Sequence, residues 1–110
     1  MSEIALASVD GDALIANARA LLQNAAFSEA VDLCDQVLAD QPENTEALYT
    51  KAIALRFQRD IQGALRVITQ LIEIDPGNGR AHQERGHCLR DTGDTAGSFA
   101  AYQDAVTRNA

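Results

Sequence analysis

The chain contains few residues of the types that carry redox or metal chemistry. Its 110 residues include no tryptophan, two cysteines, two histidines and one methionine. Cys34 and Cys88 stand alone on helical runs, without the paired Cys or Cys/His spacing of a zinc or redox site. We therefore expect both to be small buried apolar residues, and we expect no cofactor.

Positive charge is also scarce. Nine Lys and Arg residues face sixteen Asp and Glu, so the net charge is −7, which repels phosphate backbones and anionic lipid. No apolar run approaches the roughly 20 residues that cross a bilayer. The first ten residues contain no Lys or Arg and lack a signal-peptide layout. The sequence predicts a cytoplasmic protein that binds neither nucleic acid nor membrane.

The chain has only two prolines, Pro42 and Pro76. Each is followed two positions later by an asparagine, Asn44 or Asn78, and each separates two runs with helical periodicity. Proline ends the preceding helix because it lacks an N–H, and asparagine is a preferred N-cap of the next. A turn that recurs after about 34 residues indicates an array of helical repeats.

Shifting the chain against itself by this interval also aligns small and apolar positions. Small residues at the aligned positions let paired helices cross closely. The aligned sets are Ala18, Ala52 and Gly86; Leu21, Leu55 and Leu89; and Ala30, Ala64 and Ser98. Six helices are predicted, near 11–24, 28–40, 45–58, 61–74, 79–92 and 95–108.

Polar residues mark where these helices begin. Asp10, Asn44 and Asn78 share one register and are predicted to cap the first helix of each pair. Asp60 and Asp94 are predicted to cap second helices. Gly93, next to Asp94, is predicted to adopt the left-handed conformation that closes a helix.

These residues resemble the tetratricopeptide repeat, a helix pair with a small residue in each helix and a proline at the closing turn. The resemblance covers residues 11 to 110 and implies an all-α, right-handed superhelical solenoid of three antiparallel helix pairs. The expected division is an extension over 1–10 and repeats over 11–44, 45–78 and 79–110. His82 departs from the pattern, because it stands where the other units have leucine.

The final predicted helix carries Phe99, Tyr102 and Val106 with nothing after it to cover them. A repeat of this kind buries its apolar face only against a neighbour, and natural arrays usually end in a polar cap. We therefore expect the chain to be a fragment of a longer protein, with a free end that self-associates.

The sequence offers no convergent set of catalytic groups. It has no glycine-rich phosphate loop, nucleophile elbow or helical zinc motif. The stretch HQERGHC places His82 and His87 five positions apart, about 140° around a helix, so they cannot readily bind one metal from a single face. We predict that the chain is not an enzyme and assign no catalytic or metal-binding residue.

In the family the first helix of each pair lines a concave groove, and one register row there would hold Ile15, Tyr49 and Gln83. Tyr49, Ile53 and Phe57 would supply an apolar and aromatic anchor. Arginines nearby could pair with a carboxylate through two parallel hydrogen bonds. The expected ligand is therefore an extended peptide of a protein partner; simple packing between repeats is the alternative. The candidate groove residues are Arg19, Tyr49, Ile53, Arg56, Phe57, Arg80, Gln83, His87 and Arg90.

Two family functions can be weighed against these residues. Chaperone-tail clamps of the family would place their polar and basic residues at Ile15, Arg19, Thr50, Arg80 and Glu84. Glu84 reverses the expected charge and Ile15 removes it, which disfavours that function. The stretch RAHQERGHCLRDTGD is similar to repeats that precede the catalytic domain in bacterial sulfotransferases. An accessory role in a larger enzyme therefore stays open as an alternative to a peptide-binding scaffold.

Overall fold

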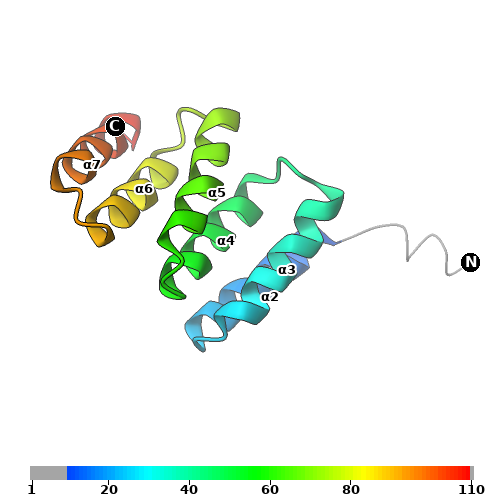
Figure 1. Ribbon diagram of the computed structural model, residues 1–110. Helices are drawn as coiled ribbons and strands as arrows, with labels where there is room; N and C mark the ends of the chain where they lie inside the picture. Colours follow the sequence, from blue (N-terminus) through cyan, green and yellow to red (C-terminus); the bar gives the residue numbers. More distant parts are fainter. Residues whose placement is uncertain (1–9, 110) are drawn as a thin grey trace, which may run out of the picture.

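The computed structural model describes residues 10–109, which form six helices in three antiparallel hairpins (Figure 1). These residues contain no strand, and each predicted helix boundary lies within one residue of the observed one. The all-α repeat solenoid predicted from the sequence is confirmed. The proposed extension over 1–10 lies, apart from Asp10, outside the described residues, as does Ala110. The helices are α2 (Gly11–Gln23), α3 (Phe27–Asp40), α4 (Thr45–Phe57), α5 (Ile61–Ile74), α6 (Gly79–Asp91) and α7 (Thr95–Asn109).

The first helix of each hairpin begins at the predicted cap. The side-chain Oδ1 atoms of Asp10, Asn44 and Asn78 each accept a hydrogen bond from the backbone N–H three positions later, at 3.1, 3.0 and 3.1 Å. A cap of this kind stabilises a helix by about 1 kcal/mol. Asp60 and Asp94 cap α5 and α7 in the same way, at 3.0 and 2.8 Å. The chain therefore starts five of its six described helices with an acidic or amide side chain.

The turn inside each hairpin also recurs once per repeat. Ala25, Arg59 and Gly93 all have left-handed backbone, with φ of 61°, 69° and 88°. The N–H of the following residue then bonds to the carbonyl five positions earlier, at 2.8 to 2.9 Å in all three turns. The prediction for Gly93 is confirmed. Ala25 and Arg59 adopt the same conformation at a cost of roughly 1–2 kcal/mol each, so the turn is set by position in the repeat rather than by glycine.

The hairpins stack in a row, 55 Å along its longest axis (Figure 1). Each second helix packs against the first helix of the next hairpin, as α3 does on α4 and α5 on α6. The first helices also contact one another, α2 with α4 and α4 with α6, whereas the second helices α3, α5 and α7 do not. The row therefore bends toward the first helices. The exposed sides of α2, α4 and α6 form its concave side, called the inner face below.

The buried core crosses the boundaries between hairpins. Ala54 of α4 packs into a cluster with Ala18, Ala30 and Cys34 of the first hairpin. Ala81 of α6 joins a cluster of the middle hairpin around Leu48, Ala52, Ile68 and Leu71. No hairpin completes its core alone, so stability depends on the interfaces between neighbours.

The third hairpin pairs an unusually small residue with an unusually large one. Gly86 occupies the position of Ala52, and Tyr102 occupies the position of Ile68. A Cβ atom on residue 86 would lie 2.6 Å from Cε1 of the Tyr102 ring, which is too close for a real contact. Tyr102 therefore fits between α6 and α7 only because residue 86 has no side chain.

This pairing makes the effect of Gly86→Ala depend on residue 102. With Tyr102 present, we expect overpacking, typically about 1–3 kcal/mol, to exceed the roughly 1 kcal/mol that alanine gains over glycine in a helix. In a Tyr102→Ile background, which copies the middle hairpin, the same substitution should stabilise by about 1 kcal/mol. Urea unfolding of the four proteins measures both effects. Stabilisation by Gly86→Ala with Tyr102 in place would show that the ring does not fill this space.

Candidate functional site

One carboxylate at the centre of the inner face joins all three first helices. Glu46 of α4 accepts hydrogen bonds from Arg19 of α2 and from Arg80 of α6, the latter at 3.3 Å. The Arg80 guanidinium also lies over the ring of Tyr49, 4.1 Å from its centroid. All three charged side chains are 41–51% exposed, so each pair contributes little to stability. In this arrangement Arg19 and Arg80 share one carboxylate partner.

Arg56, by contrast, is largely withdrawn from the inner face. Its Nε and Nη2 atoms donate to the two carboxylate oxygens of Glu84, at 2.5 and 3.3 Å, and the side chains are only 12% and 3% exposed. Burial disfavours the charge on Arg56, but the hydrogen bond and charge of Glu84 outweigh it and raise the pKa of Arg56 above its ordinary value. The pair holds α4 to α6.

The equivalent positions at the interface between α2 and α4 hold uncharged residues. Leu22 and Thr50 stand at the register positions of Arg56 and Glu84, and Thr50 is 1% exposed. Neighbouring first helices can therefore be joined at these positions either by an ion pair, as between α4 and α6, or by uncharged residues, as between α2 and α4.

Near the third hairpin, two of the predicted residues gather around a tyrosine. The Nδ1 atom of His87 lies 2.7 Å from the hydroxyl of Tyr102, and Arg90 donates to the same hydroxyl at 3.5 Å. Burial lowers the pKa of His87 below its ordinary value of 6.5, opposed by the charge of Glu84. At neutral pH this imidazole is therefore uncharged.

The remaining predicted residues are spread out. Tyr49 and Ile53 are half-buried on the middle first helix, and Gln83 is exposed on α6. Phe57, 48% exposed, lies at the end of α4 with its ring centroid 5.5 Å from that of Phe27. It therefore stands at an edge of the inner face.

Ile15 departs from the predicted row. It was expected beside Tyr49 and Gln83 on the groove surface, but it is only 4% exposed and packs with Val37 and Ala47. As part of the core beneath α2 it is unavailable to a ligand. The prediction for Ile15 is therefore wrong.

The carboxylate partners of the arginines in the candidate site were not predicted from the sequence. Glu46 and Glu84 accept hydrogen bonds from arginines that lie 27 to 34 residues away in the chain. The signal was available, because separations close to the repeat length place side chains on neighbouring first helices. All four arginines among the predicted site residues are thus already paired with carboxylates: Arg19, Arg56, Arg80 and Arg90.

The described residues hold no group of three or more His, Cys, Asp and Glu side chains that could bind a metal ion. His82 is buried and donates from Nε2 to the carbonyl of Pro76 at 2.9 Å, away from His87. Burial raises the thiol pKa of Cys34 to about 11, and burial with the charge of Glu84 raises that of Cys88 to about 12. Both thiols therefore stay protonated at neutral pH.

No helix within residues 10–109 has the length and apolarity to cross a membrane.

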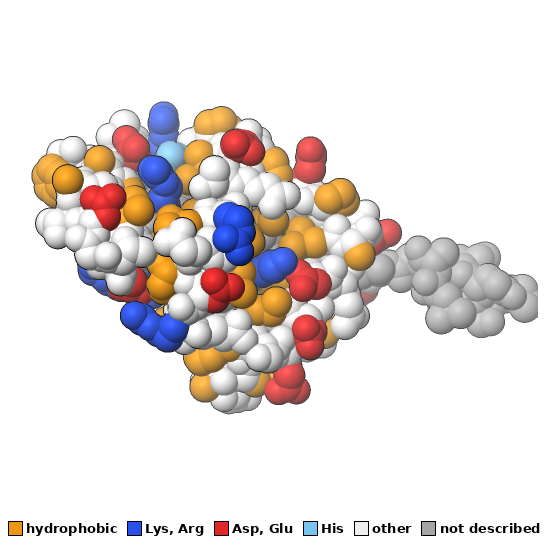
Figure 2. Space-filling view, in the orientation of Figure 1, with side chains coloured by type: hydrophobic (Ala, Val, Ile, Leu, Met, Phe, Trp, Pro, Cys, Tyr) orange, Lys and Arg blue, Asp and Glu red, His pale blue; other side chains and the backbone are white. Residues whose placement is uncertain are grey.

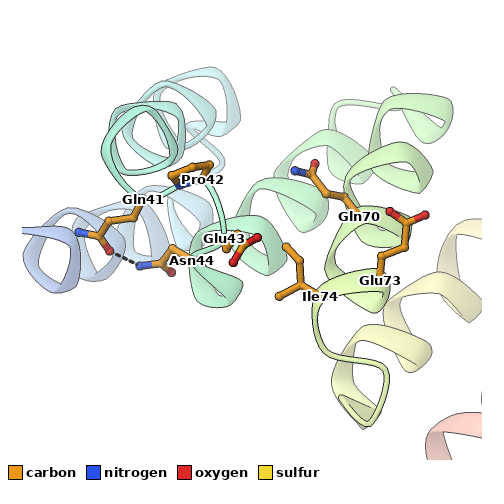
Figure 3. A pocket seen from close by; sticks show the side chains of 7 residues that line it. All are labelled: Gln41, Pro42, Glu43, Asn44, Gln70, Glu73 and Ile74. Atoms are coloured by element: carbon orange, nitrogen blue, oxygen red, sulfur yellow. Dashed lines mark hydrogen bonds between the residues drawn. The ribbon is translucent and has the colours of Figure 1, made fainter.

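A separate hollow lies away from the inner face, between the α3–α4 turn and the end of α5 (Figure 3). Its volume is about 670 Å³, and its lining includes the carboxylates Glu43 and Glu73 together with Pro42 and Ile74. A hydrogen bond of 2.8 Å between Asn44 and Gln41 holds its rim. None of the nine predicted site residues lines this hollow, so it is separate from the candidate site.

The Arg56–Glu84 pair predicts an asymmetric mutational response. Arg56→Leu alone leaves a buried carboxylate without its partner and should cost about 3–5 kcal/mol. Adding Glu84→Thr copies the α2–α4 interface and should restore most of that loss, since apolar replacement of a buried pair is often neutral. Arg19→Leu, which breaks an exposed pair, serves as control and should cost about 1 kcal/mol or less. Equal costs for the two single arginine variants in urea unfolding would contradict the burial argument.

Comparison with known proteins agrees with this geometry. A family model described as tetratricopeptide repeat matches residues 21–83, more than half of the chain. A relative from Hordeum vulgare, named probable UDP-N-acetylglucosamine–peptide N-acetylglucosaminyltransferase SPINDLY, is 34% identical over 79 residues. That match takes in 72% of this chain but only 8% of the relative's length.

Solved structures share the same arrangement of hairpins. The tetratricopeptide domain of Sgt2 from Aspergillus fumigatus has a TM-score of 0.87 at 24% identity, over 93% of this chain and 68% of that one. SycD, a type III secretion translocator chaperone of Yersinia enterocolitica, has 0.86 at 14% identity, over 92% and 77%. MamA from Desulfovibrio magneticus RS-1 has 0.82 at 16% identity, over 91% and 56%. Given the repeated hairpins, their shared turns and the family match, the chain belongs to the tetratricopeptide repeat family.

Proposed function

We propose that the inner face binds an extended segment of a protein partner, anchored by an apolar side chain. The observation that carries this proposal is the position of Tyr49 and Ile53. Both are half-buried on the middle first helix, so part of each side chain is accessible there, and Arg80 stacks on the tyrosine ring. Aromatic residues flanked by arginine are favoured anchors in binding sites.

The charges of the inner face suit a partner segment whose net charge is close to zero. Arg19 and Arg80 share Glu46, and Arg56 is buried against Glu84. A carboxylate on the ligand would have to displace an existing partner, so it gains less than it would from a free arginine. The anchor is therefore apolar, and polar contacts come from Gln83, His87 and Arg90 beside it.

Family membership supports a binding role, because stacked helical repeats present extended concave surfaces. The SycD relative is named as a translocator chaperone, which is consistent with recognition of another protein. The role proposed for this chain is that of a scaffold rather than a catalyst.

One observation favours a second role. The relative from Hordeum vulgare is a glycosyltransferase by name, and the match spans 8% of its length. These hairpins could serve a larger enzyme as the part that recognises its protein substrate. The inner face would be the contact surface in that role too, so the same residues are tested.

Peptides selected from a random library on the full chain test the inner face. We expect Tyr49→Ala and Ile53→Ala each to weaken binding of the selected peptides at least tenfold, since truncating an interface anchor costs about 2 kcal/mol or more. Arg66→Glu on the outer side of α5 is the control and should bind as the parent does. If the selected peptides bound Tyr49→Ala and Ile53→Ala as tightly as the parent, the inner face would not be the site.

A further inference from the structure

The outer side of α7 exposes large apolar side chains. Phe99 and Val106 are 64% and 71% exposed, and with Tyr102 they line a shallow hollow of about 370 Å³. In Figure 2 hydrophobic side chains are exposed at the end of the molecule where α7 lies. Soluble proteins seldom leave such a surface uncovered without a partner for it.

The repeat register shows what kind of surface this is. Phe99 and Val106 occupy positions that, in the first two hairpins, lie against the next hairpin. The equivalent pairs are Val31 with Leu38, and Leu65 with Ile72. Each of these four side chains is half-buried beside a cluster that includes an alanine of the following first helix. The outer side of α7 is therefore built like two surfaces that the chain itself covers with a helix.

The covering helices share a pattern of small residues. At the contact positions α4 has Ala47 and Ala54, and α6 has Ala81 and Cys88, all 0% exposed. The same register positions in α2 are Ala13 and Ala20, and both are exposed. No large side chain at these two positions keeps another helix away. The outer side of α2 thus carries the surface that fits a helix such as α7.

We propose that α7 of one copy packs on α2 of a second copy, head to tail, continuing the stack. The two surfaces lie at opposite ends of the 55 Å row and cannot meet within one molecule (Figure 1). The contact joins two different surfaces, so it leaves a free α2 and a free α7 and can extend to longer assemblies.

Polar groups at the proposed contact are compatible with this packing. Within the chain, Lys51 of α4 pairs with Asp35 of α3 at 2.7 Å. The register equivalents at the contact between copies are Asn17 of α2 and Gln103 of α7, which are both exposed. Their amides can hydrogen-bond to each other without bringing like charges together.

Sedimentation velocity of the full chain from about 10 µM to about 1 mM, a range suited to small interfaces, tests the proposal. The buffer should contain about 0.15 M salt, because the charge of −7 on each copy repels another copy at low ionic strength. The parent should show a weight-average mass that rises with concentration above the 11.8 kDa of one chain. Phe99→Glu and Ala20→Glu should each remain monomeric.

A 1:1 mixture of these two variants gives the sharpest result. One retains a normal α2 surface and the other a normal α7 surface, so the mixture should form a heterodimer that neither forms alone and that does not grow further. Ala100→Glu is the matched control, because positions 32, 66 and 100 are all exposed in the repeat register, and it should associate like the parent. Circular dichroism checks that each variant keeps its helices.

A parent that stays monomeric over the whole range would overturn the proposal. So would association of Ala20→Glu at the parental strength, because that result would mean that α7 meets another α7 or a surface other than α2.

Discussion

The structure depends on close contact between helices at small side chains that recur once in every repeat. Ala18, Ala52 and Gly86 on the first helices, and Ala30, Ala64 and Ser98 on the second, are buried where the helices meet. Helix backbones approach one another only as far as their interface side chains allow. With these positions small, each hairpin closes tightly and exposes an apolar side, which must be covered by the next hairpin. The linear stack and its concave side both follow from that requirement.

Within this frame the interfaces between neighbouring first helices differ in chemistry. At the α2–α4 interface two register positions hold the uncharged Leu22 and Thr50, whereas at the α4–α6 interface the equivalent positions hold the ion pair of Arg56 and Glu84. The difference matters for function, because the buried pair removes an arginine from the inner face. The side chains left for a partner are then Tyr49 and Ile53, set among arginines that already have carboxylate partners. The ligand proposed for this face is accordingly mostly neutral and anchored by an apolar side chain.

Local chemistry was predictable from the sequence, and chemistry between hairpins was less so. The caps at Asn44 and Asn78 and the left-handed conformation of Gly93 depend on residues close in the chain, so the residue types at these positions are enough to predict them. The left-handed backbone at Ala25 and Arg59 has no such signal, because it is imposed by the repeat geometry. The burial of Ile15 and of Arg56 depends on how near the adjacent hairpin stands. Periodicity alone does not give that distance.

The central claim is that the three hairpins share one core and stabilise one another. Amide hydrogen exchange of Ala52→Leu, compared with Ala39→Leu at an exposed position, tests it most directly, since Ala52 is fully buried in the middle hairpin. The account predicts faster exchange in α2, α3, α6 and α7 as well as in α4 and α5, and little change for the control. Faster exchange confined to α4 and α5 would contradict it, because each hairpin would then be stable by itself.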